Sequence, residues 1–136
     1  MDGKMLRYKA VVAILSLLLM IMVIPHTLED FALGEPAKNG IPILILQVVV
    51  ALLVAVQALG LYLLGGNHRL GYFIQMGIGI IWPLLAGSAQ LPAIFSSQPY
   101  RSGFSSVFFV IGMILIGALL FLASIQGLRI TAKEKN

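Results

Sequence analysis

The chain alternates between four long apolar stretches and short polar connections. As a helix that rises about 1.5 Å per residue, each stretch can cross a hydrocarbon core ~30 Å thick. The charged residues lie in the connections and near the two ends. The pattern predicts an all-α membrane protein: one four-span membrane domain over residues 1–136, with transmembrane helices at about 7–24, 41–64, 70–95 and 104–125.

The connections predict how these helices are arranged. The second and third spans are joined by a short turn, Gly65 to Asn67, so we expect antiparallel neighbours in a bundle. Most lysines and arginines lie near the two ends of the chain and in the second connection, whereas the other two connections carry only Lys38 and Arg101. By the positive-inside rule, both termini face the cytoplasm and the protein lies in the cell membrane. We interpret the first span as an uncleaved helix rather than a secretory signal.

Composition strengthens this prediction and removes several kinds of chemistry. The chain is 60% hydrophobic and 10% charged, whereas soluble domains are about 25% charged. The net charge of +4 comes from residues that flank the spans, so it indicates membrane orientation rather than binding to nucleic acid. The absence of cysteine excludes disulfides, thiolate metal sites and thiol catalysis.

The third span differs from the others because polar and small residues interrupt it. Five of its residues follow one another at helical spacing and therefore share one face: Gln75, Gly79, Trp82, Ala86 and Gln90. Proline within a helix opens the carbonyl ladder, so we expect a kink beside this face. Two glutamines of the second span lie within about 80° of one another around a helix and can both face the interior. The candidate seam or ligand cavity comprises Gln47, Gln57, Gln75, Gly79, Trp82, Pro83 and Gln90.

Two interpretations of this set are open. In the first, amide side chains hydrogen-bond between helices, at about 0.6 kcal/mol each, while Gly79 permits close packing. In the second, Pro83 opens a cavity, lined by amides and an indole, for a neutral lipid-like ligand such as a quinone or isoprenoid. The sequence favours the structural seam, although Trp82 falls near the middle of its span rather than at an interface.

A second candidate site follows the first span. On a helix, His26 would reach Glu29 and Asp30 at i+3 and i+4, so the three could hold a metal ion or exchange a proton. The HExxH spacing of zinc hydrolases is absent, and carboxylates at a membrane surface are readily solvated. We therefore favour a solvated connection and no metal. His68 lies on the opposite side in the predicted topology, which argues against a bis-histidine haem, and we predict no cofactor.

No span carries a charged residue in its middle, which argues against ion-coupled transport. Three functions remain, in this order. The first is association, as a self-assembling bundle or an accessory subunit of a larger membrane complex. The second is a carrier or binding protein for a small neutral or lipophilic solute, lined by the third span. The third is a surface metal-dependent enzyme or sensor that uses His26. Because no catalytic constellation is present, the sequence favours a non-enzymatic protein whose partners are the lipid bilayer and another membrane chain.

Overall fold

The computed structural model describes residues 3–133, and its regular secondary structure is entirely helical within that range. Four helices are long and apolar enough to cross a membrane, which confirms the predicted all-α class and the number of candidate spans. They are joined by short connections, one of which contains a single helical turn. In chain order the helices are α1 (Gly3–Ala32), α2 (Glu35–Lys38), α3 (Ile43–Gly65), α4 (Arg69–Ile94) and α5 (Phe104–Lys133).

Helix α1 contains Pro25 and continues past residue 24, where the predicted first span ends. A proline removes one backbone hydrogen bond without necessarily ending a helix, and here the helix runs on to Ala32. The Thr27 hydroxyl donates a hydrogen bond to the Val23 carbonyl at 2.8 Å in the turn around the proline. The last two turns of α1 therefore carry the polar residues that the sequence placed in a connection.

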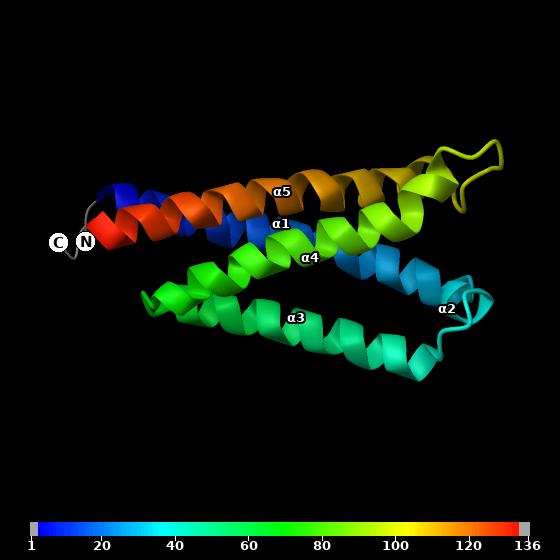
Figure 1. The fold of residues 1–136 in the computed structure, drawn as a ribbon, viewed down its shortest axis with the longest axis horizontal. Helices are drawn as coiled ribbons and strands as arrows, with labels where there is room; N and C mark the ends of the chain where they lie inside the picture. Colours follow the sequence, from blue (N-terminus) through cyan, green and yellow to red (C-terminus); the bar gives the residue numbers. More distant parts are fainter. Residues whose placement is uncertain (1–2, 134–136) are drawn as a thin grey trace.

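The long helices run in alternating directions (Figure 1). Helix α5 packs along both α1 and α4, while α3 packs mainly against α4. At one end of the bundle, the Lys9 ammonium at the start of α1 donates to the Gly65 carbonyl at 2.7 Å and to the Asn67 side chain at 2.9 Å. Helix α2 and the connection between α4 and α5 lie at the other end (Figure 1).

Glycines allow the backbones of neighbouring helices to touch. A Cβ on Gly79 of α4 would lie 2.7 Å from the Phe121 nitrogen of α5. A Cβ on Gly71 would lie 2.5 Å from the Leu64 nitrogen, where α4 meets the end of α3. Close approach of this kind is a common basis of association between membrane helices, because lipid supplies no hydrophobic drive. Gly79 therefore belongs to the α4–α5 interface and Gly71 to the α3–α4 interface.

Helix α3 stays close to its neighbours only over its second half. Its buried residues are Gln57, Gly60 and Leu64, and the first half of the helix buries none. Figure 1 shows α3 and α4 meeting near their shared turn and separating toward the end where α2 lies. This divergence positions the candidate site.

Candidate functional site

A network of hydrogen bonds joins α1, α3 and α4 where α3 begins to diverge. The Gln57 amide of α3 donates to the carbonyl and the hydroxyl of Ser16, at 2.9 and 3.0 Å. The Gln75 amide donates to the Gln57 backbone carbonyl at 2.9 Å, and the Trp82 indole donates to Gln57 Oε1 at 3.2 Å. All four side chains are buried. We call Ser16, Gln57, Gln75 and Trp82 the apex network.

The local sequence explains why the apex network forms where α3 begins to diverge from α4. Gly60 lies one turn after Gln57, and a Cβ there would lie 2.7 Å from the Gln75 amide nitrogen. Its missing side chain therefore leaves room for the Gln75 amide to cross to α3. Hydrogen bonds between membrane helices contribute about 0.6 kcal/mol each on average. The apex network lies at the point from which α3 diverges, because Gln57 is the first buried residue of that helix.

Beyond the apex network a cavity of about 1030 Å³ opens between α3 and α4. Its walls are largely apolar: α3 contributes Leu46, Val50 and Leu53, and α4 contributes Leu85 and Ala86. Trp82 belongs to both the lining and the apex network, so its indole forms the floor. Ligand sites in proteins commonly measure about 300–1,000 Å³, so the cavity is large enough for a ligand of that class.

The cavity extends a considerable distance along the bundle. From Trp82 to Ala93, both of which line it, α4 advances about 16 Å at its usual rise per residue. That length is roughly half the ~30 Å thickness of a hydrocarbon core. A molecule that fills the cavity would reach from one end of the bundle to its middle.

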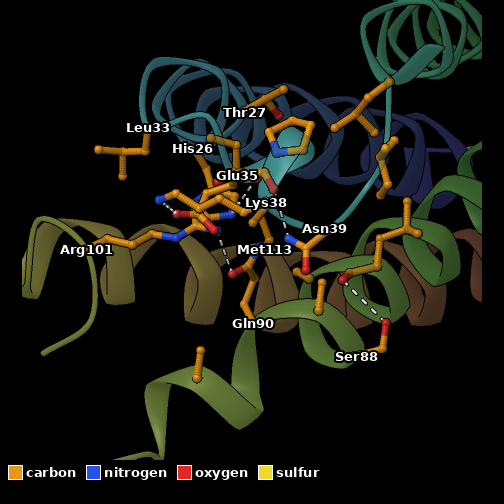
Figure 2. Close-up of a pocket in the computed structure, with 18 of the residues that line it drawn as sticks. His26, Thr27, Leu33, Glu35, Lys38, Asn39, Ser88, Gln90, Arg101 and Met113 are labelled. Carbon is orange, nitrogen blue, oxygen red and sulfur yellow. Dashed lines mark hydrogen bonds and ion pairs between the residues drawn. The ribbon is translucent and has the colours of Figure 1, made fainter. Parts of the chain in front are cut away.

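Polar side chains gather at the open end (Figure 2). Arg101, in the connection after α4, forms an ion pair with Asp30 of α1 and donates to Gln90 Oε1 at 2.9 Å. The Tyr100 hydroxyl donates to the same Gln90 oxygen at 2.9 Å. Together with His26, these four residues line the cavity, and we call the five the rim cluster. It ties the connection to α1 and α4.

Burial shifts the pKa of the two rim residues that lie in the connection, Tyr100 and Arg101. Burial, followed by the negative charges of Glu29 and Glu35, raises the pKa of Tyr100 to about 12. The phenol therefore stays a hydrogen-bond donor at neutral pH. Burial also lowers the pKa of Arg101, while Glu29 opposes that shift. Arginine starts from so high a pKa that Arg101 remains a cation opposite Asp30.

His26 lies among these groups without a hydrogen bond of its own. Its Nδ1 is 4.0 Å from Glu29 Oε2, and its Nε2 is 3.8 Å from Asp30 Oδ2. Both separations exceed hydrogen-bonding distance. Glu29 instead accepts hydrogen bonds from Ser102 and Ser106, both at 2.5 Å. The two carboxylates thus bond to the connection and to α5, and no group of three His, Cys, Asp or Glu residues within 3–133 could hold a metal ion.

The structure does not bring the predicted seam or cavity residues together at one site. Gln57, Gln75 and Trp82 meet in the apex network, whereas Gln90 belongs to the rim cluster. Gly79 and Pro83 contact α5, where a Cβ on Gly117 would lie 2.3 Å from Pro83 Cγ. Gln47 is exposed on the diverging half of α3.

Sequence reasoning did not assign Ser16, Tyr100 or Arg101 to a site. Arg101 carried a usable signal, because Asp30 and Arg101 lie on the same side of the predicted topology. Ser16 carried no such signal, since the hydroxyl of a serine in an apolar helix commonly donates a hydrogen bond to the backbone of its own helix.

No family model, curated protein or solved structure matches this chain.

Proposed function

We propose that this protein is a membrane-embedded binding protein for a neutral lipophilic molecule. The observation that carries the proposal is the cavity between α3 and α4, with apolar walls, an indole at its floor and polar groups at its rim. Sites for small molecules combine largely apolar linings with a few placed polar groups in this way. From the sequence alone we placed this function second, after association with another membrane chain. The cavity is the reason that we now place ligand binding first.

Charge balance supports a neutral ligand. The acidic residues that line the cavity, Asp30 and Glu35, are each paired with a basic residue of the lining. Their partners are Arg101 and Lys38. No lining charge is left over to balance an ionic ligand, and an unpaired charge is costly to bury.

The cavity walls also supply a route of entry. Val49 of α3 and Leu85 of α4 line the cavity yet are 42% and 48% exposed. In a bilayer these side chains would face lipid, so a lipophilic molecule can enter sideways without crossing water. With both termini in the cytoplasm, the mouth would open toward the outer leaflet of the cell membrane.

The fluorescence of Trp82 tests this proposal, because it is the only tryptophan of the chain and lines the cavity floor. Titration with a neutral lipid brominated near the end of its tail is expected to quench Trp82 saturably. Ala89→Phe, which fills the cavity from the α4 wall, is expected to reduce the quenching several-fold. Leu84→Phe is the matched control, since Leu84 is 64% exposed on the same helix and outside the lining. Equal quenching of all three proteins would refute binding in the cavity.

Association with another membrane chain is a second candidate. The exposed first half of α3, including Gln47, buries no residue within the chain, and that surface is available to a partner helix. The same surface also faces lipid in a monomer, so this observation supports association less directly than the cavity supports binding.

A further inference from the structure

The imidazole of His26 is a buried polar group with no hydrogen bond at the wall of the cavity. The residue is 4% exposed, and Nδ1 has no partner among residues 3–133. Buried polar groups in native proteins nearly always have a partner. Nδ1 faces Glu29 and Nε2 faces Asp30, and Nε2 is the ring nitrogen to which a ligand placed between His26 and Asp30 would bond. Figure 2 shows His26 beside the cavity, near Arg101 and Gln90.

The other polar groups around His26 already have partners. Arg101 bonds to Asp30 and Gln90, and the Tyr100 hydroxyl also bonds to Gln90. Deeper in the cavity, the Trp82 indole donates to the apex network. The imidazole is therefore the buried polar side chain of the lining that a ligand can still satisfy.

The space between His26 and Asp30 indicates the chemistry of that ligand. His26 Nε2 and Asp30 Oδ2 are 3.8 Å apart, too far for a direct hydrogen bond. One oxygen about 2.8 Å from each atom can bridge them. A carboxylate oxygen only accepts, so the bridging group must donate to Asp30. The bridging group must also accept a hydrogen bond from His26 Nε2 when that nitrogen carries the proton. A hydroxyl does both, whereas an ether or carbonyl cannot donate.

We propose that the ligand is a long-chain alcohol whose hydroxyl bridges His26 and Asp30 while its tail lies between α3 and α4. This inference rests on the proposed function and adds the head group and the residues that bind it. The hydroxyl is uncharged, in agreement with the paired charges of the lining. The tail would run from the rim cluster toward Trp82, about half of the bilayer thickness.

Competition measurements on the full chain in detergent micelles test the head group. The tail-brominated lipid is bound first, and recovery of Trp82 fluorescence is followed as a competitor is added. Hexadecanol is expected to displace it at about one tenth of the concentration needed for hexadecyl methyl ether, the ratio that one net hydrogen bond of moderate strength provides. Palmitate is expected to compete no better than the ether, because its carboxylate lacks a free cation.

Two variants test the hydrogen bond from His26 to the bridging oxygen. His26→Leu removes the donor and is expected to weaken competition by the alcohol several-fold. His26→Gln, whose amide can donate in its place, is expected to retain most of that competition, and it keeps the test informative if the leucine variant fails to fold. Equal competition by alcohol and ether in the unmodified protein would overturn the head-group inference and leave the proposed cavity intact. Unsaturable quenching with no displacement would overturn both.

Discussion

Gly79→Ala is expected to destabilise the bundle by about 1–3 kcal/mol, the usual cost of adding a methyl group to a packed interior. The new Cβ would lie 2.7 Å from the Phe121 nitrogen and 2.8 Å from the Gly117 carbonyl oxygen. Both are backbone atoms, so no side chain can rotate away and α4 must move from α5. The free energy of unfolding can be measured by titrating the purified protein with sodium dodecyl sulfate and following far-ultraviolet circular dichroism.

Gly77→Ala is the matched control on the same helix. A Cβ on Gly77 meets nothing within 4 Å, so no contact opposes the substitution. Alanine favours a helix over glycine by about 1 kcal/mol, so this change is expected to be neutral or stabilising. The two substitutions therefore differ in sign. Equal effects at both positions would show that α4 and α5 do not touch through Gly79.

Arg101→Ala is expected to destabilise the protein by about 3 kcal/mol, the lower end of the cost of removing one partner from a buried ion pair. The Arg101 side chain is 9% exposed and that of Asp30 is 18% exposed, so some water reaches the pair. The substitution leaves the Asp30 carboxylate without its counter-charge and removes one of the two hydrogen bonds that Gln90 Oε1 accepts. Detergent unfolding measures the loss, and hydrogen exchange of residues 95–103 is expected to become faster.

A double-mutant cycle separates the ion pair from other effects of Arg101. In Asp30→Asn the carboxylate is gone, so the further loss of Arg101 is expected to cost clearly less than it does in the unmodified protein. If the costs of the two substitutions simply add, Asp30 and Arg101 are not coupled and the ion pair does not hold the connection to α1.

The hydrophobic pattern predicted the helices because a bilayer requires long apolar segments, but it could not predict where α3 diverges. Helix α3 is apolar around nearly its whole circumference, so its periodicity points to no particular buried face. The divergence depends on contacts distant in sequence, such as the hydrogen bonds from Gln57 to Ser16. Helix α1 runs on to Ala32, beyond the predicted first span, because Pro25 is tolerated within it.

The polar stripe on α4 was predicted as one feature, and the structure divides it between two. Helical spacing places Gln75 and Gln90 on the same face, but they are fifteen residues apart and meet different neighbours. Gln75 meets Gln57 where α3 is close, whereas Gln90 meets Arg101 where α3 has moved away. Spacing predicts a shared face, and only the packing of other helices decides what lies opposite it.

Native mass spectrometry of the protein released from mild detergent tests most directly whether the cavity between α3 and α4 binds a lipophilic molecule. The unmodified protein and Leu84→Phe are expected to carry one retained lipophilic molecule per chain, and Ala89→Phe is expected to carry none. Equal retention by all three proteins, or no bound molecule in any of them, would contradict binding in the cavity.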